Sequence, residues 1–137
     1  ENALLADVLS RIHFIQGDLF APFRSLGKRE PFDLILSNPP YINRSEIRDL
    51  AREVKDFEPI VALDGGEDGL DFYRKILSAA PFYLKKGGWL LMEVGQGQGE
   101  KVSERIMREG QFHWPELVRD FSGIGRVVKA QKAERRG

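Results

Sequence analysis

The residues best suited to chemistry in this sequence are Asn38, Pro39, Pro40 and Tyr41, which directly follow the apolar run at positions 32–36. The side chain of Asn38 and the backbone of Pro39 each offer a carbonyl acceptor. A planar NH2 group has two in-plane N–H donors, but its nitrogen is a poor nucleophile because its lone pair is drawn into the π system. Two fixed acceptors could hold such a group and leave the nitrogen open to alkylation.

The prolines and the tyrosine suit the same task. Pro39 and Pro40 fix φ, carry no competing N–H and bias the residues before them toward extended conformations. Tyr41 adds a flat face against which a planar group can lie. Such a site rejects analogues that lack the N–H groups by about 10⁴ to 10⁵, because its buried acceptors would go unpaired. The alternative is an ordinary turn, since Asn-Pro and Pro-Pro punctuate loops.

The elements that position this motif favour the chemical interpretation. Residues 32–37 are apolar on both faces, which predicts a strand buried inside a parallel sheet. Ligands of open α/β sheets bind beyond the carboxyl ends of strands, where Asn38 falls. We also expect a short strand at 12–16, which includes His13, and another buried strand at 89–94.

The remaining pattern predicts an α/β layered domain with a mostly parallel sheet and a closing antiparallel hairpin. Helical spacing at 43–56 has Ser45 as its N-cap, and Pro81 should kink or end a second helix at 70–84. The other expected elements are an irregular loop at 57–69, a turn at 85–88, a helix at 100–109, hairpin strands at 116–121 and 126–130, and a polar tail at 131–137.

The glycine-rich segment 95–99 follows a strand and opens a helix, as in dinucleotide-binding sites. Its spacing is G-x-G-x-G without the third glycine at the usual place, and no acidic residue ends a strand about 20 residues later. A tight strand-to-helix connection explains the same glycines, and we prefer it.

Composition sets the class of protein. The 137 residues are 42% hydrophobic and 31% charged, which indicates one globular domain with a core. Twenty-one basic residues balance twenty-one acidic ones, so no net field attracts nucleic acid. Cysteine is absent, and His13 and His113 lack a metal-ligand spacing, so no metal is expected. No stretch is long enough to span a bilayer and no signal peptide is visible, so we expect a cytoplasmic location. The start at Glu1, without an initiator Met or an opening helical turn, suggests a fragment.

The chain resembles the C-terminal part of class I S-adenosylmethionine-dependent methyltransferase domains, and more narrowly the release-factor glutamine N5-methyltransferases of the PrmC/HemK family. The resemblance runs from Glu1 to about Val128, and its most specific part is the segment from Glu58 to Arg74. The motifs that carry it are QGDLF at 16–20, FDLILSNPPYI at 32–42, Glu58-Pro59, ALDGGEDGLDFYR at 62–74 and GGWLLMEVG at 87–95.

The resemblance implies a function and roles for named residues. Asn38 and the Pro39 carbonyl would grip a glutamine carboxamide, with Pro40 and Tyr41 completing the substrate site. The substrate would be the glutamine of the Gly-Gly-Gln loop of peptide chain release factors. Asp18 and Leu19 match positions that flank the adenine of S-adenosylmethionine, and Asn38 lies near its methionine end.

The resemblance also implies a partial Rossmann-like fold whose first two strands would precede Glu1. The cofactor's glycine-rich loop would lie there too, so the fragment is expected to bind cofactor weakly or be inactive alone. The strand at 12–16 would then pair beside 32–37, or exposed sheet edges would drive dimerisation. Three other functions stay open. They are a ribosomal-protein glutamine methyltransferase, a nucleic-acid adenine or guanine N-methyltransferase, and a noncatalytic binding remnant. Residues 56–59 and 72–74 favour release factors.

Overall fold

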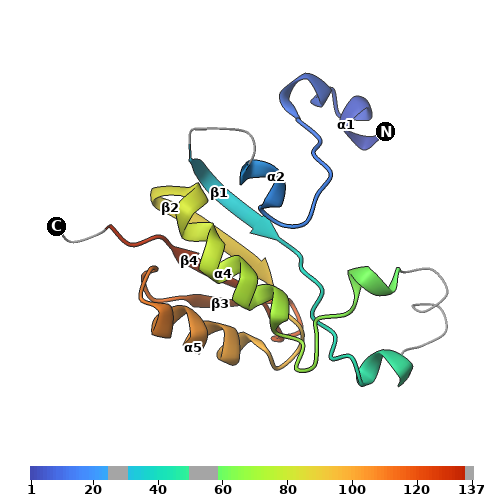
Figure 1. Cartoon of the computed structure of the whole chain (residues 1–137), viewed down its shortest axis with the longest axis vertical. Coiled ribbons are helices and arrows are strands. Elements are labelled where there is room, and N and C mark those ends of the chain that lie inside the picture. The colour runs from blue at the N-terminus through green and yellow to red at the C-terminus, as the bar shows by residue number, and fades with distance from the viewer. Residues whose placement is uncertain (25–30, 50–58, 135–137) are drawn as a thin grey trace. The chain divides into compact units, whose positions relative to one another are not determined.

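The computed structural model describes residues 1–24, 31–49 and 59–134 (Figure 1). The chain divides into two compact units, Glu1–Glu30 and Pro31–Gly137. None of the helices in the described part combines the length and the apolar character that crossing a membrane requires.

Among residues 1–24, the described part of the first unit, the regular elements are three short helices, α1 (Asn2–Leu5), η1 (Leu9–Arg11) and α2 (Ala21–Arg24). The expected strand at 12–16 does not form, and His13 lies in a segment without strand pairing. A β-type run becomes a strand only when a neighbour satisfies its backbone and covers one face. Here the Phe14 side chain is 75% exposed. The prediction of a strand was therefore wrong.

The second unit is built on a four-stranded sheet in the order β1-β2-β4-β3. Its strands are β1 (Phe32–Ser37), β2 (Leu84–Glu93), β3 (Glu116–Arg119) and β4 (Gly125–Gln131). β1 and β2 are parallel, whereas β4 runs antiparallel to both β2 and β3, so the sheet of the described residues is not the mostly parallel one predicted, because the closing hairpin supplies two of its four strands. The closing hairpin predicted for the end of the chain is confirmed.

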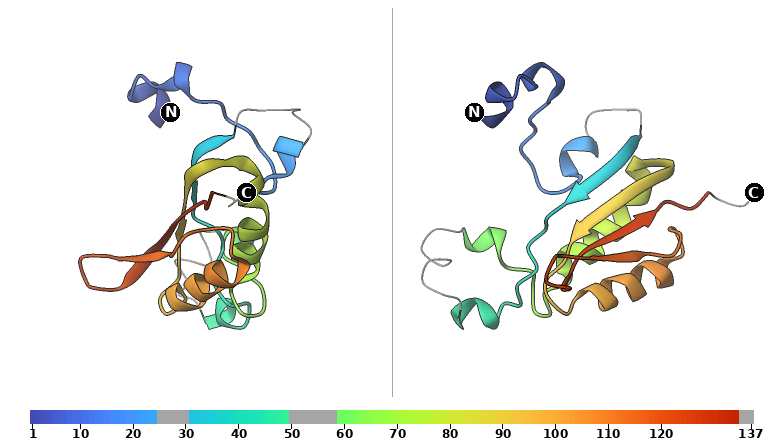
Figure 2. Two further views of the ribbon diagram at one scale, coloured as in Figure 1. Left: turned by 90° about the vertical axis from the view of Figure 1, so that its left-hand side faces the viewer. Right: turned by 180° about the vertical axis from the view of Figure 1, so that it is seen from behind.

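Two helices pack on one face of this sheet, α4 (Asp71–Tyr83) and α5 (Gly99–Glu109) (Figure 2). Alternate strand residues meet them, because successive side chains of a strand point to opposite faces. The resulting core contains Tyr73, Ile76, Leu77, Ala80, Leu90, Met92, Val94, Val102, Ile106, Val128 and Ala130. Pro81 is buried in the last turn of α4, so the helix ends two residues beyond it.

The face of the sheet opposite α4 and α5 is more exposed than the sequence predicted. Leu34 and Leu36 of β1 are 47% and 68% exposed, so β1 is not the buried strand that its apolar sequence predicted. Within the described residues β1 pairs with β2 alone and forms an edge of the sheet. A strand that is apolar on both faces is buried only when both faces are covered, which the sequence of the strand cannot determine.

The bounds of three predicted segments also differ in the structure. β2 begins at Leu84, and the residues expected to form a turn at 85–88 bulge within it: Leu84 pairs with Phe32, but Trp89 already pairs with Leu34. Of the helix expected at 43–56, the structure describes η2 (Glu46–Asp49), and positions 50–56 lie outside the described residues. The expected tail at 131–137 is hydrogen-bonded at its start, where Gln131 ends β4 and Ala133 N donates to Gln111 O at 3.0 Å.

Ser45 does not act as the predicted N-cap. Its backbone N–H and its hydroxyl both donate to Oδ1 of Asn43, at 2.9 and 2.8 Å. The backbone carbonyl of Asn43 in turn accepts from Glu46 N at 2.9 Å. An asparagine that bonds to the backbone two residues on forms a local turn, so Asn43 begins this segment.

Candidate active site

The Asn38–Tyr41 motif lies at the carboxyl end of β1, next to the carboxyl end of the parallel strand β2. Ser37 pairs with Met92, which places Asn38 beside Glu93. Asn38 is exposed, whereas Pro39 is buried. A cavity of about 300 Å³ opens at this strand end and is lined by Leu36, Ser37, Asn38, Leu91, Glu93 and Val127. The sheet thus places the Asn38 amide and the Glu93 carboxylate in one cavity whose lining also includes apolar side chains.

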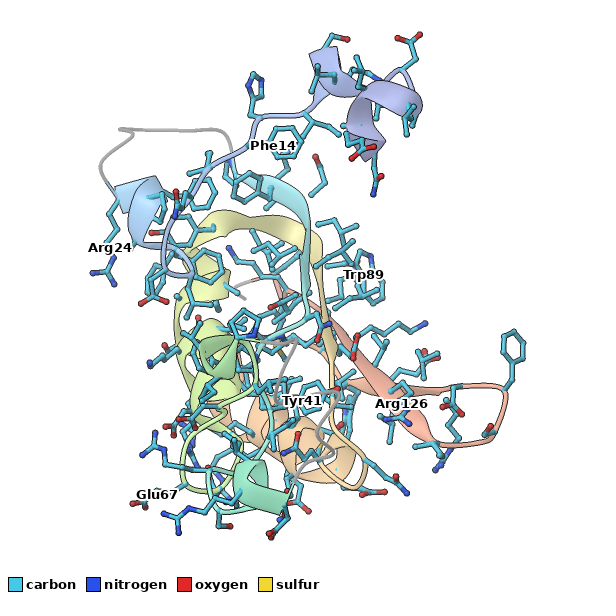
Figure 3. All side chains as sticks on the ribbon, turned by 90° about the vertical axis from the view of Figure 1, so that its right-hand side faces the viewer. Phe14, Arg24, Tyr41, Glu67, Trp89 and Arg126 are labelled. Atoms are coloured by element: carbon cyan, nitrogen blue, oxygen red, sulfur yellow. The ribbon has the colours of Figure 1, made fainter. Side chains whose placement is uncertain are left out.

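Tyr41 faces the same strand end through its hydroxyl, which donates to Oε1 of Glu93 at 3.4 Å. Burial raises the pKa of Tyr41, and the nearby negative charge of Glu93 raises it further. The positive charge of Arg126 lowers the pKa of Tyr41. Tyr41 and Arg126 lie at the same end of the sheet (Figure 3). The phenol therefore stays neutral and can serve as a flat wall with one donor.

Gln98 ties the motif to the end of β2. Its side-chain Nε2 donates to the backbone carbonyl of Tyr41 at 2.9 Å, and its Oε1 accepts from Gly95 N at 3.1 Å. The Tyr73 hydroxyl lies within hydrogen-bonding distance of the same Oε1, at 3.3 Å, and of the Glu93 carbonyl, at 3.1 Å. Because one half-buried amide satisfies three groups, the backbone that follows Pro40 has a fixed position.

The loop before α4 supports the motif from its other side. Gly65 N donates to Ile42 O at 2.8 Å, and Ile42 N donates to Leu63 O at 3.0 Å. A Cβ added at Gly65 would lie 2.8 Å from the backbone of Tyr41, so only glycine fits there. The loop around Gly65, which belongs to the most specific part of the family resemblance, therefore packs against the backbone of the Asn-Pro-Pro-Tyr motif.

Ion pairs hold this loop at its surface. Arg44 Nε contacts Asp64 Oδ2 at 3.0 Å, and Arg74 contacts both Asp68 and Asp71. The pKa of Asp64 is lowered chiefly by the backbone N–H of Gly66, and next by Arg44. The pKa of Asp68 is lowered chiefly by its hydrogen bond to Arg74. Both carboxylates therefore stay ionised at neutral pH and keep their partners at the surface of the loop.

Proteins of known name match most of this chain. The sequence is 43% identical over 134 residues to a protein of Thermodesulfovibrio yellowstonii named release factor glutamine methyltransferase, covering 98% of this chain and 46% of that protein. It is 50% identical over 119 residues to the protein of the same name in Geobacter sulfurreducens, covering 87% of this chain and 40% of that protein. The chain belongs to the release factor glutamine methyltransferase family.

No protein-family profile matches the chain. A methyltransferase from Pyrococcus furiosus of known crystal structure superposes with a TM-score of 0.51 at 16% identity, over 78% of this chain and 44% of that one. A likeness at this identity concerns the fold, and it confirms a partial Rossmann-like class I methyltransferase fold. The chain spans less than half the length of the curated relatives it matches.

Asp18 and Leu19, the residues matched to the family's adenine site, lie in the first unit of the chain. Asp18 is exposed, and its backbone carbonyl accepts from Ala21 N at 2.9 Å. Leu19 has φ 45°, a left-handed conformation that costs a branched residue energy and often marks a binding site. An exposed carboxylate beside a half-buried apolar side chain fits the amine and the face of an adenine. Their role in cofactor binding stays a prediction.

Three residues of the site were not singled out from the sequence of this family member. They are Tyr73, Glu93 and Gln98. The available signals were a charged residue at the end of an apolar strand and the repeated Gly-Gln pair at 95–98. The glycines of that segment fit the tight connection that we preferred. A Cβ at Gly95 would lie 2.7 Å from Gln98 Oε1, and a Cβ at Gly99 would lie 2.6 Å from Leu117.

Proposed function

We propose that the protein carrying this chain is an S-adenosylmethionine-dependent protein-glutamine N5-methyltransferase that acts on the Gly-Gly-Gln glutamine of peptide chain release factors. The observation that carries the proposal is the placement of Asn38 and Pro39 at a parallel strand end, beside a cavity and held by the Gly65 loop. The names of the relatives supply the substrate.

Each residue of the motif has a separate task in this proposal. Oδ1 of Asn38 and the carbonyl of Pro39 accept the two N–H groups of the glutamine carboxamide. Pro40 keeps the backbone extended without a competing donor, and Tyr41 encloses the planar amide. Asn38 is exposed, so a protruding loop of a protein substrate can reach it. The catalytic residues are therefore Asn38, Pro39 and Tyr41.

S-adenosylmethionine would supply an electrophilic methyl group carried by a sulfonium. Asp18 and Leu19 would hold its adenine, and Asn38 would lie near its methionine end. The chain is balanced in charge, with 21 basic and 21 acidic residues, which fits a protein substrate and no direct nucleic-acid contact. Translation termination and a cytoplasmic location follow from the substrate and belong to this proposal.

Self-association of the chain is part of the proposal. β1 is an edge strand in the described residues, and Leu34 and Leu36 are exposed on it. Unpaired edges with exposed apolar side chains pair readily with a second copy. Sedimentation should show a dimer that Leu36→Lys dissociates, and a monomeric parent would contradict it.

The rival functions differ in what they would methylate. A ribosomal-protein enzyme would prefer a ribosomal glutamine over a Gly-Gly-Gln peptide. A nucleic-acid methyltransferase would bind DNA or RNA with strong salt dependence. A noncatalytic remnant would give no heat with millimolar S-adenosylmethionine in calorimetry.

The experiment that tests the function measures methyl transfer to a Gly-Gly-Gln peptide by mass spectrometry. It uses this chain alone and, in parallel, joined to the N-terminal portion of the Geobacter sulfurreducens relative. We expect Asn38→Ala to lower turnover by about 10²- to 10³-fold, because one fixed acceptor is lost. Thermal stability should hardly change, since Asn38 is exposed. Equal loss of activity and stability would make Asn38 a structural turn residue.

A further inference from the structure

The carboxylate of Glu93 lies at the strand end that carries Asn38, and the two residues line the same cavity. Glu93 is the last residue of β2, is half-buried, and lines the same cavity as Asn38. The register puts the two residues side by side on neighbouring strands, which run about 4.8 Å apart in parallel sheets. Leu36 and Leu91 supply apolar walls. A group bound at Asn38 therefore meets one negative charge in a partly apolar setting.

The contacts of Glu93 leave part of its carboxylate open. Oε1 accepts from the Tyr41 hydroxyl at 3.4 Å, a long hydrogen bond. In the described part of the chain no hydrogen bond reaches the second oxygen, Oε2. Arg126, the cation near Tyr41, forms its ion pair with Asp120 at 3.1 Å. Glu93 thus keeps acceptor capacity that the fold does not use.

Methylation of an amide nitrogen creates a proton that must leave. The nitrogen lone pair forms a bond to the methyl carbon, and the electrons of the breaking C–S bond stay on the sulfur of the sulfonium donor. The nitrogen then carries a positive charge and two hydrogens. Loss of one hydrogen as a proton gives the neutral N-methyl amide.

We propose that Glu93 accepts this proton, and that its negative charge favours the positive charge which develops on the amide nitrogen. The proposal rests on the function proposed above and adds a further catalytic residue to it. As the nitrogen becomes tetrahedral, the N–H that Asn38 Oδ1 held turns toward Glu93, and its proton passes to the Glu93 carboxylate, which becomes a carboxylic acid and later returns the proton to water. A preorganised charge beside the reacting atom acts most strongly in the transition state, because only there is the positive charge on the nitrogen present.

Glu93→Gln tests the charge with little change of shape. It is made in the chain joined to the N-terminal portion of the Geobacter sulfurreducens relative, with Glu100→Gln, an exposed residue of α5, as the matched control. We expect kcat to fall by about 10²-fold or more, the usual effect of a lost general base. The Kd of a Gly-Gly-Gln peptide, measured without cofactor, should stay within about threefold, and Glu100→Gln should match the parent.

Formate provides a readout that a structural role would not move. In Glu93→Ala the side-chain space is vacated, so formate should restore kcat by about tenfold or more, while Asn38→Ala should gain nothing. A Glu93→Gln protein that turns over like the parent would overturn the assignment, as would a Glu93→Ala protein that formate does not rescue. An inactive parent would instead overturn the proposed function, and the role of Glu93 with it.

Discussion

The side-chain amide of Gln98 donates to the backbone carbonyl of Tyr41 at 2.9 Å, across 57 positions of sequence. The same side chain accepts from Gly95 N at 3.1 Å. The end of β2 and the strand-end motif after β1 are therefore fastened by one residue at the start of α5. This bond gives the motif a fixed geometry that two prolines alone cannot provide.

Replacing Gln98 should weaken both the fold and the site. Gln98→Ala leaves the Gly95 N–H and the Tyr41 carbonyl without their partner, which costs about 1–3 kcal/mol per buried group. Gln98→Glu keeps the acceptor but removes the donor to Tyr41, so it should lower methyl transfer at least as much as Gln98→Ala does. Urea unfolding and the peptide assay measure the two effects. The exposed Gln96 gives the control, and a Gln96→Ala protein as impaired as Gln98→Ala would contradict the prediction.

Gly65→Ala should disturb the motif through backbone contact. Its Cβ would lie 2.8 Å from the backbone of Tyr41, and overpacking of this kind typically costs about 1–3 kcal/mol. Because the displaced group is Tyr41, activity should fall together with stability.

Gly97→Ala is the control for Gly65→Ala, because it should lower stability without displacing Tyr41. Gly97 has φ 79° and open space around its Cβ position, so alanine there costs about 1–2 kcal/mol of backbone strain without pushing any neighbour. It should lower the melting temperature and leave turnover of the remaining folded protein unchanged. Equal specific activities of the two variants would show that Gly65 does not position Tyr41.

Tyr73→Phe should make the alkaline stability of the protein flatter. Burial raises the pKa of Tyr73, so the fold favours the neutral phenol. The stabilisation is complete below about pH 10, the pKa of a tyrosine in the unfolded chain, and is lost as pH rises from there toward the folded pKa. At pH 7 the variant loses hydrogen bonds worth about 0.5–1.5 kcal/mol each.

Urea unfolding at pH 7, 9, 10 and 11 measures the difference between the parent and Tyr73→Phe. This difference should shrink above pH 10, since only the parent then has a phenol to ionise on unfolding. A constant difference over the whole range would mean that Tyr73 does not contribute through its proton.

Tyr41→Phe and Tyr41→Ala should separate the flat face of Tyr41 from its hydroxyl. The 3.4 Å bond to Glu93 is long, so Tyr41→Phe should lower turnover by less than about tenfold. Tyr41→Ala removes the wall of the site and should lower it by about 10²-fold or more. Steady-state kinetics with the Gly-Gly-Gln peptide give both numbers, and equal losses would assign the function to the hydroxyl instead.

The local sequence determined the elements whose causes are local. The glycine-rich connection after a strand predicted the helix at 100–109, which the structure has as α5 with Gly110 as its left-handed C-cap, and the apolar run before Asn38 predicted β1. The motif itself was proposed from donor and acceptor chemistry and from its place at a predicted strand end, and its role stays a prediction. Its neighbours in the sequence, especially 62–74, carried the family resemblance, which the relatives confirm.

Tertiary structure decided the features that depend on contacts with other segments of the chain. The β-type run at 12–16 forms no strand, and β1 is exposed on one face, because pairing and burial are supplied by other segments. Glu93 and Gln98 were ordinary polar residues in the sequence. Only the parallel register of β1 and β2 places Glu93 beside Asn38, and only the turn into α5 brings Gln98 to Tyr41. Residue types and spacing define a motif, whereas distances between remote side chains are properties of the folded chain.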